Sequence, residues 1–229
     1  LRSSGISCMG VTAIKQYSTV YKGRIVDIRY NFDYSNLLNK KNDSNNKTLT
    51  FLFSGRLVEF RNPLLVIDCF TEIVKRYPSK DLKLIMSGKG ELYGECIKLI
   101  SRGEIVDKVE WINNFKDWYD IHQIYQKSQI LLSLQHYSTW GIPIQEAMAS
   151  GMGIIAYRSI EAADSLILNG YNGFKVSNKS EALKCMESYV NNYDLVKIHG
   201  KRSRDIIQLY NCKDSAKLFL DLLQNNTST

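Results

Sequence analysis

From Leu49 onward, short and almost wholly apolar runs alternate with longer segments in which apolar residues recur at helical spacing. Continuous Leu, Ile, Val and Phe runs indicate strands buried on both faces, which is typical of a parallel sheet covered by helices. The alternation therefore predicts an α/β fold with a doubly wound parallel sheet of the Rossmann-like kind. The expected strands are Leu49–Ser54, Leu82–Ser87, Lys108–Ile112, Ile130–Leu134, Gly153–Tyr157 and Gly173–Val176. The expected helices are Leu64–Tyr77 (starting at Asn62 and Pro63), Glu91–Ser101, Asp117–Lys127, Pro143–Ser150 and Ile160–Asn169, with helical sequence from there to about Leu223.

The two ends of the chain differ from this alternating core. The first part holds a helical stretch, Val11 to Tyr21, and a strand-like run, Arg24–Tyr30, which we interpret as the end of a preceding domain. The chain does not begin with Met, and we expect it to belong to a longer protein. The expected divisions are a residual segment with crossover (1–38), a polar linker (39–48), a Rossmann-like domain (49–210), and a C-terminal helix with a disordered tail (211–229).

Composition narrows the class of protein. Hydrophobic residues make up 44% and charged residues 23%, which is ordinary for a globular protein, and no apolar run could span a bilayer. The opening residues lack the apolar region of a signal peptide. The five scattered cysteines form no CxxC pair, which disfavours a zinc ribbon and fits free thiols in the cytoplasm.

The net charge of +7 is diffuse. It fits a solvated basic surface, or attraction to phosphorylated substrates, or attraction to anionic lipids with peripheral contact at the inner face of the membrane, and these alternatives stay open. No basic motif interleaved with aromatic residues appears, so nucleic acid is not an expected partner.

The stretch from Trp140 to Gly151, WGIPIQEAMASG, is the most informative part of the chain. Pro143 suits the first position of a helix, because its missing N–H costs nothing there. Gly141 lets a ligand approach the backbone closely, and free N–H groups beyond it suit an anion such as phosphate. Glu146, expected in the first helical turn, can accept two hydrogen bonds from a ribose diol. Together these features predict a pocket for a nucleotide or a nucleotide sugar.

Two arginines follow the first strand of the predicted domain. Arg56 comes directly after the strand end, and Arg61 stands just before the next helix start. Guanidinium groups are planar and permanently charged, so the pair can converge on one diphosphate. Two loop arginines alone are more often solvated or salt-bridged, and the combination with the Gly141 turn favours the diphosphate.

The loops after the next two strands also lie where ligands of such sheets bind. The loop with Gly88 and Lys89 lacks the spacing of a dinucleotide-binding loop, and is either a tight turn or a wall for a nucleobase. The loop with Ile112 and Asn113 has the same two interpretations, because its backbone amides could contact the edge of a base.

Other chemistry finds little support. His136 is either an acid/base candidate or a structural residue, and His122 and His199 lie on predicted helices without a partner pattern. No spacing of His, Cys, Asp and Glu suggests metal ligation, and no nucleophile elbow is present.

The ordered series of motifs resembles the C-terminal, donor-binding half of GT-B glycosyltransferases of the retaining group 1 family. The family pattern has a strand followed by Gly-Arg and another basic residue, a GxG loop, a pair of acids around a Gly-aromatic-Gly-x-Pro turn, and a closing Asn-Gly turn. The resemblance extends over roughly Leu49 to Val176, and Tyr30–Asp33 resembles the crossover from an N-terminal domain. The matching residues are Phe53–Val58 with Arg61, Ser87–Gly90, Ser138–Gly151 and Asn169–Phe174.

The resemblance implies that Arg56, Arg61 and Glu146 are the catalytic residues. The cations and the helix start would stabilise the leaving diphosphate, so the substrate would be a nucleotide-diphosphate sugar, with neither metal nor cofactor. The implied donor contacts are Arg56, Arg61, Gly141, Ile142, Pro143 and Ile144 for the diphosphate, Glu146 for the ribose, Ser138 and Trp140 for the donor sugar, and Gly88, Lys89, Ile112 and Asn113 for the nucleobase.

Position 138 departs from the family pattern, because the first acid of the pair is Ser138 here. A serine hydroxyl cannot hold a carboxylate's charge beside a developing oxocarbenium ion. Either the donor lacks the hydroxyl that this acid normally contacts, as in a deoxy sugar, or activity is weakened or lost. A softer departure lies at Ser159–Asp164, where the family's glycine-rich turn is poorly kept.

We therefore expect sugar transfer from a nucleotide-diphosphate donor to a glycan or lipid-linked acceptor in polysaccharide or lipopolysaccharide assembly. The acceptor-binding N-terminal domain is expected outside this chain, which alone would bind donor but catalyse poorly. Two alternatives stay open: a nucleotide-sugar-binding module without transferase activity, and a nucleotide-sugar epimerase, for which His136 is the local acid/base candidate. The sequence determines neither base, sugar, acceptor, linkage nor oligomeric state.

Overall fold

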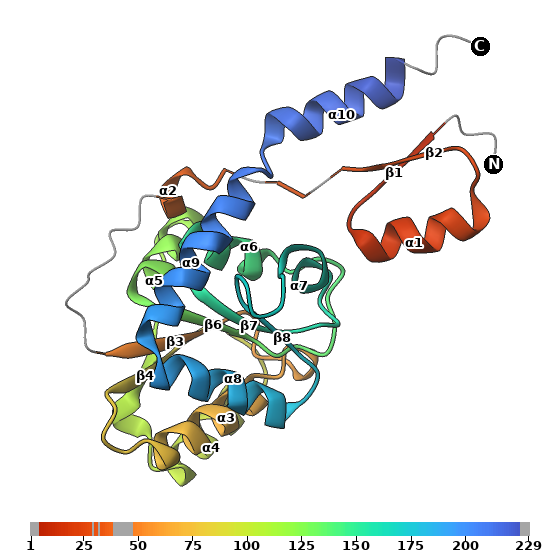
Figure 1. Cartoon of the computed structure of the whole chain (residues 1–229). Coiled ribbons are helices and arrows are strands. Elements are labelled where there is room, and N and C mark those ends of the chain that lie inside the picture. The colour runs from red at the N-terminus through yellow and green to blue at the C-terminus, as the bar shows by residue number, and fades with distance from the viewer. Residues whose placement is uncertain (1–4, 29, 32, 39–47, 225–229) are drawn as a thin grey trace.

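The central sheet is built from β3 (Leu49–Ser54), β4 (Leu82–Ser87), β5 (Val109–Trp111), β6 (Ile130–Ser133), β7 (Gly153–Tyr157) and β8 (Phe174–Val176). These strands pair in parallel in the order β5-β4-β3-β6-β7-β8 (Figure 1). The computed structural model describes residues 5–28, 30–31, 33–38 and 48–224. The strand order reverses between β3 and β6, and the crevice at such a switch point is where doubly wound sheets bind ligands.

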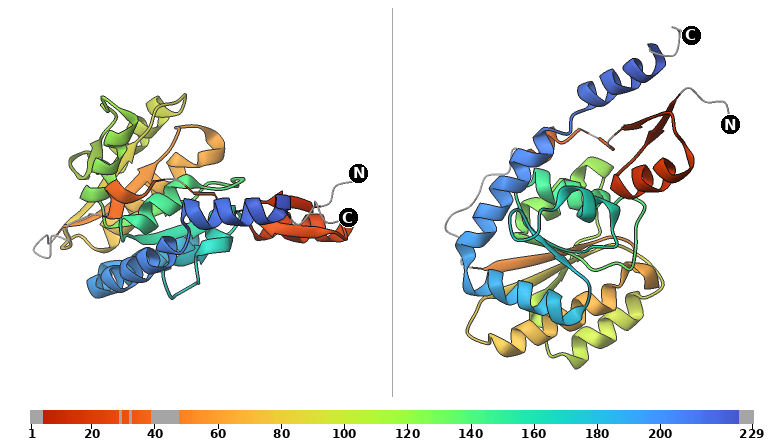
Figure 2. Two further views of the ribbon diagram at one scale, coloured as in Figure 1. Left: turned by 90° about the horizontal axis from the view of Figure 1, so that it is seen from above. Right: turned by 45° about the vertical axis from the view of Figure 1, so that its right-hand side comes forward.

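Burial on both faces of the sheet accounts for the continuous apolar runs. In β3, Phe51 and Phe53 pack into one hydrophobic cluster while Leu52 packs into the opposite one. The prediction of a doubly wound parallel sheet is therefore confirmed (Figure 2). The first cluster lies under α3 (Pro63–Arg76), α4 (Tyr93–Arg102) and α8 (Lys179–Asn191), and the second contains residues of α2 (Ser35–Leu38), α5 (His122–Lys127), α6 (Ile142–Ala149), α7 (Glu161–Leu166) and the end of α9 (Tyr193–Gln208).

Several predicted boundaries shift for local reasons. The helix predicted over Asp117–Lys127 is a short 3₁₀ turn, Trp118–Ile121, followed by α5. The helix predicted to reach Asn169 ends at Leu166, because the Asn172 side chain accepts a hydrogen bond from the Leu168 N–H at 2.7 Å. The structure also has 3₁₀ turns at Glu59–Arg61 and Val106–Lys108.

The start of the chain forms a small unit beside the large sheet. Its strands, β1 (Gly5–Cys8) and β2 (Arg24–Asp27), pair in parallel and are joined by α1 (Val11–Val20). The predicted strand Arg24–Tyr30 is thus shorter than expected. Near the other end of the chain, α10 (Cys212–Gln224) lies beside β2 (Figure 2).

The predicted segment 1–38 does not end where the small unit ends. Tyr34, just before α2, and Leu37, within α2, are buried in the second hydrophobic cluster of the large sheet. Residues 39–47 of the predicted linker and 225–229 of the predicted tail lie outside the described residues.

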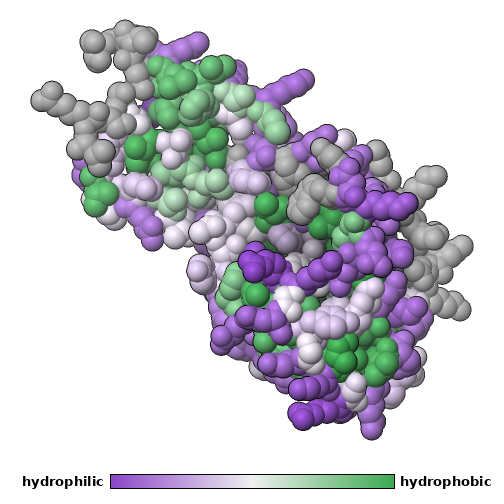
Figure 3. All heavy atoms as spheres, turned by 180° about the vertical axis from the view of Figure 1, so that it is seen from behind, coloured by the Kyte–Doolittle hydropathy of each residue, from purple (hydrophilic) through white to green (hydrophobic). Residues whose placement is uncertain are grey.

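The surface over the small unit and α10 differs from the rest of the described chain. Figure 3 shows hydrophobic side chains gathered there, whereas the visible face of the large domain is more polar. Exposed large apolar side chains in this part include Val20, Phe219, Leu220 and Leu223. Among the described residues, no helix combines the length and apolar character that crossing a bilayer requires.

Candidate functional site

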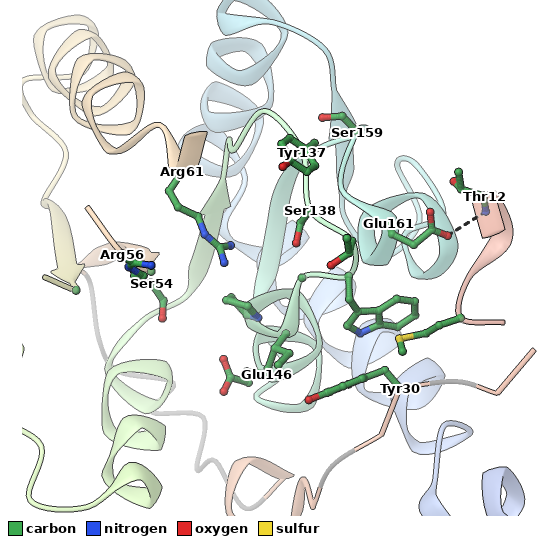
Figure 4. A pocket seen from close by; sticks show the side chains of 18 of the residues that line it. Thr12, Tyr30, Ser54, Arg56, Arg61, Tyr137, Ser138, Glu146, Ser159 and Glu161 are labelled. Carbon is green, nitrogen blue, oxygen red and sulfur yellow. Dashed lines mark hydrogen bonds between the residues drawn. The ribbon is translucent and has the colours of Figure 1, made fainter. Parts of the chain in front are cut away.

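A cavity of about 1150 Å³ opens at the carboxyl ends of β3, β4 and β6, between the large sheet and the small N-terminal unit. Most predicted site residues line this one cavity, including the arginines, the Gly141 turn and Glu146 (Figure 4). The connection from β1 to α1 and the first turn of α1 contribute the opposite wall, through Met9 and Thr12 respectively. The separate motifs of the sequence therefore meet in space, although Ile112 and Ile144 are not part of the lining.

The turn before α6 needs glycine at position 141. Gly141 has φ +125°, and a Cβ there would lie 2.7 Å from the Ile160 side chain. The helix starts at Ile142, so Pro143 is its second residue rather than its first. The Ile144 N–H donates to the Gly141 carbonyl at 3.0 Å, and Pro143 has no N–H. The donors that this helix start can offer to an anion are therefore those of Gly141 and Ile142, and the predicted amide of Ile144 is already engaged.

Glu146 lies in the second turn of α6, not the first as predicted. Its side chain is buried, and Oε2 accepts a hydrogen bond from the hydroxyl of Tyr125, whose ring is fully buried on α5. Burial raises the pKa of Glu146 to about 7, and the Tyr125 hydrogen bond limits that rise. A carboxyl group in this state accepts hydrogen bonds from hydroxyl groups but has no cation beside it to neutralise its charge.

The two arginines reach the cavity from the loop after β3. Arg61 is half-buried, and Figure 4 shows its side chain pointing into the same space as that of Ser138. Burial lowers the pKa of Arg61, and the nearby charge of Arg56 lowers it further. Among the described residues neither arginine forms an ion pair with a carboxylate.

Arg61 is held by a neutral partner instead. Its Nη1 donates to Oε1 of Gln135, a buried side chain just beyond the end of β6. Arg61 Nε and Gln135 Nε2 are buried atoms for which the described structure provides no hydrogen-bond partner. Asn62 fastens this loop to the end of β6, because its side-chain amide donates to the Leu134 carbonyl at 3.1 Å. A fixed, partly dehydrated cation with unused donors is suited to binding an anion.

The glycine loop after β4 packs directly against the loop that carries Arg56. A Cβ on Gly88 would lie 1.8 Å from the Gly55 carbonyl oxygen, and the Gly88 N–H donates to Asn113 Oδ1 at 2.6 Å. Gly88, Lys89 and Asn113 line the cavity. Ile112 packs against the second hydrophobic cluster instead, so its side chain is part of the core.

The two predicted donor-sugar residues have different surroundings. Ser138 lines the cavity and pairs through its backbone with Ile160, and its carbonyl accepts the Glu161 N–H at 3.3 Å. The ring of Trp140 is largely buried, with its Nε1 donating to Gln145 Oε1 at 2.8 Å. Gln145, which lies on α6, in turn donates to the Tyr30 carbonyl at 2.8 Å, so Gln145 links both Trp140 and α6 to the crossover segment.

Three polar residues of this region escaped the sequence analysis: Tyr125, Gln135 and Glu161. Glu161 lines the cavity but turns toward the small unit, where Oε1 accepts the Thr12 N–H at 3.2 Å (Figure 4). Gln135 and Glu161 each follow a strand, and that position was the signal available for them. Tyr125 gave no signal, because it occupies an ordinary apolar position of a predicted helix.

The histidines do not contribute to the cavity. His136 is exposed and is not among the lining residues. His199, expected to lack partners, is buried between the Tyr189 hydroxyl at 2.9 Å and the Gly170 carbonyl at 3.2 Å. Among the described residues, no cluster of His, Cys, Asp and Glu side chains could hold a metal ion.

A parallel sheet in this order, with cations, a helix start and a buried acid at its switch point, defines a domain of the Rossmann-like class. The fold matches that of GT-B glycosyltransferases. The chain belongs to the family described as glycosyl transferases group 1, which matches residues 35–206.

Individual proteins resemble the chain to different extents. An uncharacterized glycosyltransferase of Haemophilus influenzae is 28% identical over 171 residues, which cover 72% of this chain and 46% of that protein. The poly(glycerol-phosphate) alpha-glucosyltransferase of Bacillus subtilis is 26% identical over 122 residues, or 53% of this chain and 17% of that protein. The structure of TarM from S. aureus, in complex with fondaparinux, alpha-GlcNAc-glycerol and UDP, aligns with a TM-score of 0.77 at 18% identity over 96% of this chain and 43% of TarM. The chain thus spans less than half the length of these relatives.

Proposed function

We propose that this chain is the donor-binding part of a retaining glycosyltransferase that moves a sugar from a nucleoside diphosphate to a glycan or lipid-linked acceptor. The observation that carries the proposal is the pair Arg56 and Arg61, which face the Gly141 turn without a carboxylate partner in the described structure. Two cations that line one cavity without a carboxylate partner favour the binding of an anion with two or more charges.

The geometry supports a division of the donor among named groups. The diphosphate binds Arg56, Arg61 and the N–H groups of Gly141 and Ile142, and these stabilise the negative charge that develops as the glycosidic bond breaks. The ribose diol donates to Glu146, and the nucleobase lies toward Gly88, Lys89 and Asn113. No step requires a metal, because fixed cations and backbone dipoles hold the leaving group.

Ser138 determines which sugar is accepted in this proposal. Its hydroxyl faces the cavity, where it can hydrogen-bond a donor sugar without bringing a negative charge (Figure 4). The proposed donor is a sugar that lacks the hydroxyl that the family's acid contacts, such as a deoxy sugar. The indole N–H of Trp140 is engaged with Gln145, so Trp140 shapes this part of the cavity rather than donating to the sugar.

The proposed acceptor domain packs on the small N-terminal unit. That unit has two strands and one helix, and apolar side chains such as Val20 and Phe219 are exposed on it and on the adjacent α10. We propose that the chain alone binds donor but transfers sugar poorly, because chemistry occurs between the two domains. Assembly of a surface polysaccharide or lipopolysaccharide, on the cytoplasmic side and in peripheral contact with the membrane, is the proposed setting. The Bacillus subtilis relative is named for glucosyl transfer to poly(glycerol-phosphate), which supports a polymeric acceptor.

A thermal-shift panel of UDP, GDP, dTDP and ADP tests donor binding, with UDP first because TarM was crystallised with it. A nucleotide at a hundred times its dissociation constant is expected to stabilise the protein by about 2.7 kcal/mol. Arg61→Met is expected to reduce this stabilisation to between about 0.4 and about 1.4 kcal/mol, because a 10- to 100-fold weaker affinity leaves the nucleotide at only about one to ten times its dissociation constant. Arg76→Met is the matched control, because Arg76 is an exposed arginine paired with Glu72 and Glu187. No shift with any of the four nucleotides contradicts the proposal.

The donor-sugar proposal has its own test in the full-length enzyme. Ser138→Glu restores the acid of the family pattern and is expected to move donor preference toward a sugar that carries the missing hydroxyl. Ser159→Glu, at another serine of the same cavity, is the control for an added charge. An unchanged preference in Ser138→Glu counts against the deoxy-sugar donor.

Product analysis distinguishes the alternatives. A transferase releases free nucleoside diphosphate in the presence of acceptor, an epimerase returns an isomeric nucleotide sugar, and a binding module does neither. The epimerase finds no support in the cavity, because His136 lies outside its lining.

A further inference from the structure

The buried side chain of Glu146 is hydrogen-bonded to a neutral phenol and, within the described residues, forms no ion pair. Tyr125 lies on α5 and its ring is fully buried. Its hydroxyl donates a hydrogen bond to Glu146 Oε2. The same hydroxyl lies 3.3 Å from Ser54 Oγ, at the last residue of β3. One phenolic oxygen of α5 therefore contacts residues of two other elements, α6 and β3, that meet at the switch point of the sheet.

This contact divides the two carboxylate oxygens between protein and cavity. Glu146 Oε2 accepts the hydrogen bond from Tyr125, whereas Glu146 Oε1 accepts none within the described part of the chain. Glu146 nevertheless lines the cavity with only 4% of its surface exposed. A carboxylate that is fixed through one oxygen presents the other in a single direction, which lowers the entropy lost when a diol binds.

The contact also connects the predicted ribose site to the predicted diphosphate site. Ser54 is two residues before Arg56, and Gly55 between them donates its N–H to the Ser87 carbonyl at 2.9 Å. A shift of Tyr125 would therefore disturb the direction of the Glu146 carboxylate and the end of β3 together. The distance between ribose and diphosphate in a nucleotide is fixed, so holding their partners in register favours one class of ligand.

We propose that Tyr125 is a positioning residue for the ribose: its hydroxyl orients the Glu146 carboxylate toward the 2′- and 3′-hydroxyls and keeps it in register with the Arg56 loop through Ser54. This inference rests on the proposed function, since it assumes that a nucleoside diphosphate occupies the cavity. Tyr125 itself contacts no ligand, because its ring is fully buried and it is not among the lining residues.

The test compares binding of UDP and GDP with binding of their 2′,3′-dideoxy forms by calorimetry. In the wild-type chain, loss of the diol is expected to weaken binding at least about tenfold, as for hydrogen bonds to a charged group. In Tyr125→Phe this ratio is expected to fall below about threefold, while the dideoxy nucleotide binds as before. Tyr189→Phe is the matched control, because it also removes a buried phenol hydroxyl that is hydrogen-bonded, to His199, but outside the cavity.

Each outcome has a distinct meaning. Both phenylalanine variants lose a buried hydrogen bond and some thermal stability, so a merely structural role lowers the melting temperature without changing the diol ratio. A Tyr125→Phe protein that melts cooperatively and keeps the wild-type ratio overturns the proposal. Glu146→Gln distinguishes two reasons for such a result. If this variant also keeps the wild-type ratio of affinities for the nucleotide and its dideoxy form, the assignment of Glu146 to the ribose is wrong. If the ratio falls in Glu146→Gln but not in Tyr125→Phe, only the role of Tyr125 is wrong. If wild type binds neither UDP nor GDP, and the other nucleotides of the panel also fail, the proposed function fails first.

Discussion

Replacing Glu146 with glutamine is expected to make the ligand-free protein more stable and its nucleotide binding weaker. Glutamine keeps the shape of the side chain and can still accept the Tyr125 hydrogen bond through its amide oxygen. It removes the requirement to bury a negative charge, because 4% of Glu146 is exposed and the described structure places no cation in an ion pair with it.

The pKa of Glu146 gives the magnitude and the sign. Burial raises this pKa from the ordinary 4.5 to about 7, so the folded protein binds the proton more tightly than the unfolded chain does. A raised pKa contributes stability that is fully present below pH 4.5 and is lost as the pH rises through about 7. Since one pKa unit corresponds to about 1.4 kcal/mol, the loss above pH 7 is about 3 kcal/mol. The Glu146→Gln protein does not undergo this loss.

Urea unfolding at pH 5 and pH 8.5 measures the effect. The advantage of Glu146→Gln over wild type is expected to be small at pH 5 and to approach about 3 kcal/mol at pH 8.5. Glu187→Gln is the control, because it removes a half-buried carboxylate that is paired with the exposed Arg76, and a pair at the surface contributes about 0–1 kcal/mol. A Glu146→Gln protein that is no more stable than wild type at pH 8.5 refutes the reasoning. With saturating nucleotide this advantage is expected to shrink by at least about 1.4 kcal/mol, because a tenfold or greater loss of affinity makes nucleotide stabilise the variant less than wild type.

Three further predictions concern the cations and the glycine loop. Arg61→Met is expected to weaken UDP binding by about 10- to 100-fold in calorimetry but to leave uridine binding unchanged, and equal losses contradict this. Gln135→Glu brings a carboxylate to Arg61, and the new ion pair is expected to weaken UDP binding about tenfold while leaving uridine binding as it was. Gly88→Ala is expected to cost more than about 2 kcal/mol in urea titrations, because its Cβ would lie 1.8 Å from the Gly55 carbonyl oxygen. Gly94→Ala, whose Cβ would meet nothing within 4 Å, is its control and should stabilise by up to about 1 kcal/mol.

The architecture was predictable from the sequence because its strands are buried on both faces. A run such as that of β3 is apolar at nearly every position and therefore predicts a strand that is buried on both faces. The helices between strands have clear start signals such as Asn62 and Pro63. Helix ends were less predictable, because they depend on side chains from distant turns. The Asn172 side chain, which holds the turn after α7, contacts Ser203 of α9, and no local pattern announces that contact.

The residues of the candidate site that lie in loops after strands were predictable from the sequence, whereas those that lie in the hydrophobic core were not. Residues at strand ends, such as Arg61 and Gly141, converge because parallel strands bring their carboxyl ends to one edge. Tyr125 was missed because a buried tyrosine on a helix looks like packing until its hydroxyl partner is known. The placement of Glu146 in the second turn follows from helix α6 starting at Ile142, one residue earlier than the proline suggests.

The way charges are paired around the cavity distinguishes a ligand site from a structural one. In a purely structural cluster, a buried carboxylate and nearby guanidinium groups are expected to pair with one another, since their attraction offsets part of the desolvation penalty of each charge. Here Glu146 is bonded to a phenol and Arg61 to an amide, two neutral partners that orient the charges without neutralising them. A nucleoside diphosphate supplies what each group lacks, anionic oxygens for the arginines and hydroxyl donors for the carboxylate. The two ends of UDP are therefore expected to bind at the same time, so UDP should bind much more tightly than either uridine or pyrophosphate alone. A UDP affinity no higher than that of the tighter of these two parts would contradict this expectation.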